Sequence, residues 1–211
     1  MRCFVVLVLG VAVVAVVLWV VLRPAAPPAP LRATPVAGLT GYVDQPALSP
    51  DGQRVAFISN RGQADNLDVY VTSLGRGATL RRTTHPAQDY SPAWSPDGRR
   101  LAFLRAAPGP DGASEVLIMP AAGGPERKAG EVRLQANPLF LPGPFLCWTP
   151  DSSALVVTHR EAPEEPPSLY LLSLTTGVKH RLTSPPRGAP GEARCAGAQS
   201  RPWCRSRSGR R

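Results

Sequence analysis

Short apolar runs separated by polar turns recur along the middle of the chain and predict β-strands. Three of these runs, at residues 55–58, 101–104 and 155–157, show no alternation of polar and apolar positions. Runs of this kind suit strands that are covered on both faces, as in sheets stacked side by side. Each run follows a turn sequence that the chain repeats, so the pattern predicts a recurring β-hairpin.

The repeated turn reads Ser-Pro-Asp-Gly in its first two copies and Thr-Pro-Asp-Ser in the third. Proline presets φ at the second position of a type I turn, the hydroxyl bonds back to the turn backbone, and glycine accepts positive φ at the fourth position. The aspartates have no partner carboxylate at fixed spacing, so they are expected to hold turns and not to act as general acids. The predicted structural turn residues are Ser49, Pro50, Asp51, Gly52, Ser95, Pro96, Asp97, Gly98, Thr149, Pro150 and Asp151.

The turn prolines lie at 50, 96 and 150, which gives a repeat of about fifty residues. A second strand pair follows each hairpin, and four strands in a unit of this length are typical of a propeller blade. The predicted fold class is therefore all-β: a partial β-propeller of about three four-stranded blades, preceded by one N-terminal transmembrane helix. The blades are expected at about residues 41–86, 87–132 and 140–186.

Several segments resemble a known family. The Ser-Pro-Asp-Gly hairpins, Leu-Asp-Val-Tyr-Val at 67–71, Gly-Gly-Pro-Glu-Arg-Lys at 123–128 and Arg-Leu-Thr-Ser-Pro-Pro at 181–186 are similar to TolB-like, WD-type β-propellers. The resemblance is closest to the extracytoplasmic propellers of bacterial membrane-anchored regulators, whose cytoplasmic half is a winged-helix domain or a serine/threonine kinase. It implies a propeller that senses or docks a protein or peptide, with neither DNA binding nor kinase activity in this chain.

The amino terminus predicts a membrane anchor. Residues 4–22 carry no charge, and as a helix they would span about 28 Å, close to the thickness of a bilayer core. An uncleaved signal anchor is favoured over a cleaved signal peptide because the apolar run is long and the prolines after it make a poor cleavage site. Residues 1–3 would then be a short cytoplasmic end, and the Pro/Ala-rich residues 23–40 a semi-rigid linker.

Charge alone specifies the membrane orientation weakly. The resemblance implies a single-pass membrane protein with its propeller on the extracytoplasmic, periplasmic side.

The net charge of +9 is unevenly distributed along the chain. Residues 38–184 contain fourteen basic and fourteen acidic residues, whereas residues 187–211 contain seven arginines and one glutamate. The folded part is therefore not expected to bind nucleic acid. The tail is predicted to be disordered, and three interpretations stay open: an out-of-frame or truncated reading of a longer gene, a real basic tail, or an element that binds nucleic acid or acidic lipid.

The sequence offers little catalytic chemistry. It contains no Gly-x-Ser-x-Gly elbow, phosphate-binding loop, His-Glu-x-x-His or Cys-x-x-Cys motif. No catalytic, cofactor-binding or metal-binding residue is predicted, no cofactor is expected, and the protein is not expected to be an enzyme. Trp94 and Trp148 are expected in the blade core. Asp44 and Asp89, which open the first two units, are predicted to line one end of the central channel as contacts for a partner.

Two functions are therefore considered. The favoured one is a non-enzymatic, membrane-anchored binding or sensor module for protein or peptide partners. The alternative is an incomplete fragment of a larger winged-helix regulator, receptor kinase or propeller-bearing peptidase without independent activity. Because propellers close four to eight blades into a ring, three blades leave two faces open, and self-association through the open blade edges is expected.

Overall fold

The computed structural model describes residues 16, 18–19, 41–62, 65–75, 77–109, 113–134 and 145–184. Of the predicted membrane segment, only Val16, Leu18 and Trp19 are described, and they are helical. Within the described part of the chain, no helix has the length and apolar character needed to cross a membrane. The remainder of the anchor, the linker at 23–40 and the tail at 187–211 lie outside the described residues, so those predictions stay predictions.

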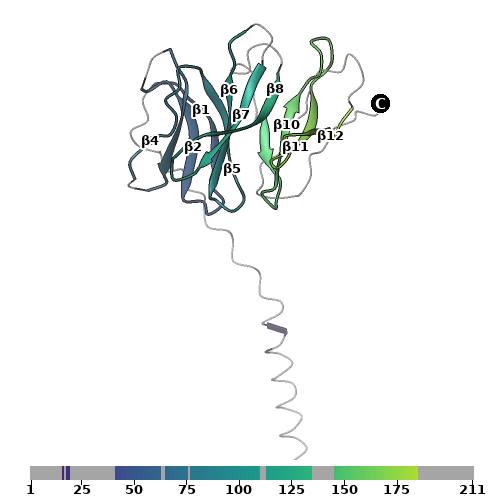
Figure 1. Cartoon of the computed structure of the whole chain (residues 1–211). Helices are drawn as coiled ribbons and strands as arrows, with labels where there is room; N and C mark the ends of the chain where they lie inside the picture. The colour runs from purple at the N-terminus through teal and green to yellow at the C-terminus, as the bar shows by residue number, and fades with distance from the viewer. Residues whose placement is uncertain are drawn as a thin grey trace, which may run out of the picture. The chain divides into compact units, whose positions relative to one another are not determined.

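The chain divides into two units, Met1–Pro35 and Val36–Arg211. In the second unit, the described residues form three four-stranded antiparallel sheets, which lie side by side in Figure 1. Blade 1 contains β1 (Val43–Leu48), β2 (Arg54–Ser59), β3 (Asp68–Ser73) and β4 (Leu80–Arg81). Blade 2 contains β5 (Asp89–Trp94), β6 (Arg100–Ala106), β7 (Ala113–Pro120) and β8 (Arg127–Arg133). Blade 3 contains β9 (Leu146–Trp148), β10 (Ala154–His159), β11 (Ser168–Ser173) and β12 (Lys179–Arg181). The prediction of an all-β fold with three four-stranded blades is confirmed.

The repeated turn joins the first and second strands of every blade. In blade 1, the backbone N–H of Gly52 donates to the carbonyl of Ser49 at 2.9 Å, which closes the turn. The Ser49 hydroxyl donates to Asp51 Oδ1 at 2.5 Å and accepts from the backbone N–H of Arg54 at 2.9 Å. The fourth position has φ 67° at Gly52 and φ 60° at Ser152, so the third copy places a serine where the others have glycine.

Apolar clusters fill the spaces between consecutive blades. Leu101 and Phe103 of β6 pack toward blade 1, whereas Ala102 and Leu104 of the same strand belong to the cluster that blade 2 shares with blade 3. Side chains alternate across a strand, so a middle blade buries both faces of its sheet. This arrangement explains why the apolar runs in the sequence lack polar alternation.

The two tryptophans bridge consecutive blades. Trp94 of blade 2 donates its indole N–H to the carbonyl of Ala47 in blade 1 at 3.0 Å, and the guanidinium of Arg54 lies 4.5 Å from its ring centroid. Trp148 of blade 3 makes the same hydrogen bond to the carbonyl of Ala93 at 3.1 Å. Both indoles are buried, so they are core residues that fix one blade against the next.

Candidate functional site at the junction of blades 1 and 2

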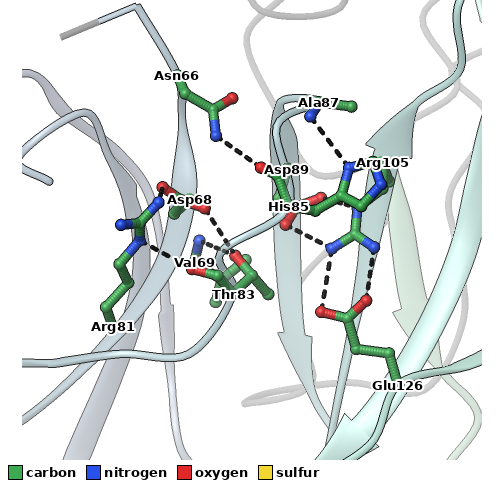
Figure 2. Close-up of polar contacts among 10 residues, drawn as sticks. All are labelled: Asn66, Asp68, Val69, Arg81, Thr83, His85, Ala87, Asp89, Arg105 and Glu126. Carbon is green, nitrogen blue, oxygen red and sulfur yellow. Dashed lines mark hydrogen bonds and ion pairs between the residues drawn. The ribbon is translucent and has the colours of Figure 1, made fainter. Parts of the chain in front are cut away.

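An ionic cluster around the buried side chains of Asp89 and Arg105 links the strands of blade 2 at its junction with blade 1. Asp89, at the start of β5, is fully buried. Arg105 of β6 binds it in a bidentate manner, with Nε 2.7 Å from Oδ1 and Nη2 2.9 Å from Oδ2. Glu126, which precedes β8, accepts from Nη1 of the same arginine at 2.5 Å. Figure 2 shows the guanidinium of Arg105 held between the two carboxylates.

A second ion pair lies in blade 1 beside this cluster. Asp68, at the start of β3, is fully buried, and its Oδ2 lies 2.6 Å from Nη2 of Arg81. The hydroxyl of Thr83 is 3.4 Å from Asp68 Oδ1 and accepts from the backbone N–H of Val69 at 2.9 Å. Figure 2 places Thr83 between the two ionic groups. The backbone joins them as well, because Asp89 donates its N–H to the carbonyl of Leu67 at 2.8 Å.

Burial and pairing act in opposite directions on these groups. Burial raises the pKa of Asp89, and hydrogen bonds from Arg105 and Thr83 oppose the rise. Burial acts to lower the pKa of Arg105, but hydrogen bonds to Asp89 and Glu126 outweigh it, so the pKa of Arg105 is raised. The arginine therefore stays charged at any physiological pH. The charged atoms of the cluster bind one another, which suits a structural role better than general acid or base catalysis.

Asn66 completes the buried polar set. Its Nδ2 donates to the carbonyl of His85 at 2.8 Å. In the described part of the chain, its Oδ1 accepts no hydrogen bond.

The structure does not place Asp44 and Asp89 at equivalent positions. Asp44 pairs with Ile58 across β1 and β2, whereas Asp89 pairs with Arg105 across β5 and β6. The repeat register therefore aligns Asp44 with Tyr90, one residue beyond Asp89, and a shift of one residue directs a side chain to the other face of its strand. Asp89 is buried in the ionic cluster, and Asp44 is half-buried. Their predicted role as partner contacts at a central channel stays a prediction.

Asp44 lies beside an exposed aromatic side chain. The hydroxyl of Tyr42 donates to Asp44 Oδ2 at 2.7 Å, and Tyr42 is 48% exposed. The other carboxylate oxygen accepts from the backbone N–H of Gln45 at 2.7 Å. Asp44 and Tyr42 thus present a carboxylate and an aromatic ring together at the start of β1.

The sequence alone did not point to Arg105, Glu126, Asp68 or Arg81 as residues of a site. One signal was available for Arg105, since it directly follows the apolar run at 101–104. A charged residue that continues a strand covered on both faces needs a buried partner. The identity of that partner could not be read locally, because Glu126 lies twenty-one residues further along the chain.

A different polar group lies at the junction of blades 2 and 3. His159 of β10 accepts the backbone N–H of Arg133 at its Nδ1, at 2.9 Å, and its Nε2 lies 3.0 Å from Nζ of Lys179. Its ring meets Tyr170 edge-on with centroids 5.0 Å apart. Burial, together with the charge of Lys179, lowers the pKa of His159 to about 4. Across the described ranges, no three residues among His, Cys, Asp and Glu are grouped so that they could hold a metal ion.

The four-stranded blades, their stacking order and their shared turn define the class of the protein as a β-propeller. The model of the TolB beta propeller domain matches residues 30–142, more than half of the chain, and the chain belongs to that family. A comparison with curated proteins found no match.

Two solved structures illustrate the likeness of fold. TolB from Acinetobacter baumannii superposes with a TM-score of 0.55 and 21% identity, over 70% of this chain and 33% of that one. A puromycin-hydrolyzing peptidase from Mycobacterium tuberculosis gives a TM-score of 0.54 and 20% identity, over 74% of this chain and 24% of that one. At these identities the likeness shows the fold alone, and the chain spans about one third of the length of the TolB structure.

Proposed function

We propose that this chain is a non-enzymatic, membrane-anchored β-propeller module that binds or senses a protein or peptide on the extracytoplasmic side. The observation that carries the proposal is membership of the TolB beta propeller family, whose members generally mediate protein interactions. The buried ionic cluster supports a non-catalytic role, because Asp89, Arg105 and Glu126 bind one another. The balanced charge of residues 38–184 favours a protein or peptide partner over nucleic acid.

The proposed contact surface is the start of β1. Tyr42 is 48% exposed and Val43 is 37% exposed, and the carboxylate of Asp44 is fixed between the Tyr42 hydroxyl and its own strand. Tyrosine is enriched in protein interfaces because a large ring contributes contact area while its hydroxyl contributes a hydrogen bond. Asp44 thus keeps its predicted role as a partner contact in this proposal, whereas Asp89 belongs to the interior.

Photo-crosslinking tests the contact surface. A benzoylphenylalanine at Val43, in the full chain expressed in bacteria, is expected to form one discrete covalent product with a different protein. The same probe at Leu74 is the control, since Leu74 is 43% exposed and lies at the opposite end of blade 1. We expect Asp44→Ala to reduce the Val43 product. Equal products from both positions, or a product that contains only copies of this chain, would contradict the proposed surface.

A reporter fusion tests the location. Residues 4–22 supply the proposed anchor, and the proline-rich linker would hold the propeller away from the bilayer. Alkaline phosphatase fused after Ser184 is active only outside the cytoplasm, so the fusion is expected to be active. Deletion of residues 4–22 is the matched control and should abolish activity. An inactive fusion that is produced at full length would overturn the extracytoplasmic location.

A further inference from the structure

The chain contains two lysines, and the fold gives them opposite surroundings. Lys128 of β8 is 45% exposed, and its Nζ lies 2.8 Å from Oε1 of Glu115 and 2.5 Å from Oε1 of Glu131. Lys179 of β12 is half-buried. Its Nζ donates to the carbonyl oxygen of Glu131 at 3.1 Å and lies 3.0 Å from Nε2 of His159. The first lysine is thus paired with two carboxylates, whereas the second contacts a carbonyl and an imidazole.

The hydrogen bonds of His159 determine which of its ring nitrogens carries a proton. Its Nδ1 accepts the backbone N–H of Arg133 at 2.9 Å, so Nδ1 carries no hydrogen. Burial lowers the pKa of His159 to about 4, and the ring is therefore uncharged near neutral pH. In an uncharged imidazole one nitrogen accepts and the other donates. The N–H of the His159 ring is consequently on Nε2, which is the nitrogen that faces Lys179.

This tautomer makes the amine of Lys179 the acceptor. An ammonium group has three N–H donors and no free lone pair, so it cannot accept from the Nε2–H of His159. Two donors that face each other at 3.0 Å would repel. An uncharged amine instead accepts from Nε2–H through its lone pair and donates one of its own N–H groups to the carbonyl of Glu131. The geometry therefore fits the unprotonated form of Lys179. At a pH low enough to protonate the amine, its charge opposes protonation of the His159 ring.

The surroundings of Lys179 change its pKa in the same direction. Burial is the largest effect and lowers the pKa, because the charged form loses hydration. Glu161 and Glu131 act to raise it, and Arg133 lowers it further. The net result is a pKa below the ordinary lysine value, whereas hydrogen bonds to two carboxylates raise the pKa of Lys128. At a given pH, a larger fraction of Lys179 than of Lys128 is therefore unprotonated.

We infer that Lys179 is a reactive amine that captures small aldehydes as an imine. Lysine becomes a nucleophile toward carbonyl compounds when it is desolvated or lies near another cationic group, and burial and Arg133 supply these two conditions. Nζ attacks the carbonyl carbon, and the carbonyl oxygen leaves as water with both protons of the amine. A C=N bond thus replaces the C=O bond without oxidation or reduction. His159 is a positioning residue, because it stabilises the unprotonated amine through its Nε2–H.

Reductive trapping in the full chain, held in detergent, tests the inference. The probe is propanal with cyanoborohydride, which reduces the imine to a stable secondary amine, and peptide mass spectrometry measures how fast each lysine is modified. Near neutral pH, Lys179 is expected to react at least about tenfold faster than Lys128, since one pKa unit changes the unprotonated fraction tenfold. The same chain unfolded in guanidinium chloride is the control, and its two lysines should react at equal rates. Equal rates in the folded chain would overturn the inference.

The pH dependence of the two rates gives a second test on the wild type. The rate at Lys179 should reach half of its maximum at a pH at least about one unit below the corresponding midpoint for Lys128. A midpoint for Lys179 at or above that of Lys128 would overturn the inference. Because this measurement needs no substitution, it decides the reactivity of Lys179 independently of the stability of any variant.

Two substitutions test the role of His159. His159→Asn keeps an acceptor for the backbone N–H of Arg133 but is too short to donate to Nζ, so the midpoint of Lys179 should rise toward that of Lys128. His159→Gln is the matched variant, because its longer side chain places an amide N–H near the position of Nε2, and it should keep the low midpoint. Far-UV circular dichroism checks that both variants are folded. Equal midpoints in the two variants would overturn the positioning role of His159.

Discussion

The two junctions between blades share the same tryptophan hydrogen bond but contain different polar groups in their interiors. Both are joined by an indole N–H that donates to a carbonyl of the preceding blade. The junction of blades 1 and 2 also contains Arg105 with its two carboxylates, whereas the junction of blades 2 and 3 contains a neutral His159 packed against Tyr170. The repeat therefore fixes how blades dock, and the interior chemistry varies from junction to junction. The polar contacts inside the first junction are therefore ion pairs, whereas the second contains a packed pair of rings with Lys179 beside His159.

The largest effect is expected from breaking the ionic cluster. Arg105→Met leaves Asp89 buried without its partner, which should lower the free energy of unfolding by about 3–5 kcal/mol. Urea unfolding of the full chain, followed by far-UV circular dichroism, measures this loss. Arg99→Met is the control, since Arg99 is exposed and should change stability by less than about 0.5 kcal/mol. A loss below about 1 kcal/mol for Arg105→Met would show that the charges are dispensable.

The tryptophan hydrogen bonds should contribute equally to the free energy of unfolding at both junctions. Trp94→Phe and Trp148→Phe each remove the indole N–H and leave the carbonyl of Ala47 or Ala93 without its donor. We expect each substitution to lower the free energy of unfolding by about 1–3 kcal/mol. The same urea titration measures both. If the two losses of unfolding free energy differ by more than about 1.5 kcal/mol, the different interiors of the junctions, and not the shared tryptophan contact, decide how firmly the blades are joined.

Acid should weaken the second junction first. The pKa of His159 falls from 6.5 to about 4 on folding, so between these values the unfolded chain binds more protons than the folded one. Its contribution to stability is therefore complete above pH 6.5 and is lost as the pH falls toward 4. The melting temperature should decline over that interval, and His159→Gln should reduce the decline. A decline of the same size in His159→Gln would contradict this assignment.

The smallest effect concerns the turn of blade 3. Ser152 adopts φ 60°, where blades 1 and 2 have glycine at φ 67°. Because a left-handed conformation costs a side-chain-bearing residue about 1–2 kcal/mol, Ser152→Gly should raise the free energy of unfolding by up to about 1 kcal/mol after the greater freedom of the unfolded glycine is subtracted. Thermal unfolding resolves a change of this size. The control is Ser153→Gly at the next turn position, where no gain is expected because the hydroxyl donates to Asp151 at 2.7 Å.

The apolar runs and the repeated turn sequence located the central strands and turns accurately. The run at 101–104 lies within β6 (Arg100–Ala106), and the run at 55–58 lies within β2 (Arg54–Ser59). No apolar run marks the last strand of blade 2, although β8 extends from Arg127 to Arg133. That extension depends on pairing with β7, including an irregularity between Val116 and Leu117, and such pairing leaves no local apolar pattern.

The repeat, the turn chemistry, the all-β class and the burial of Trp94 and Trp148 could be read from the sequence, because they follow from strand periodicity and turn residues within a few positions of one another. The folded chain was needed to show that Asp89 is bound by Arg105 and Glu126, and that Asp44 occupies a different register position. These features depend on residues that are far apart along the chain. Ion pairing and burial depend on which strands become neighbours and on which face each side chain then points, and a shift of one residue reverses that face.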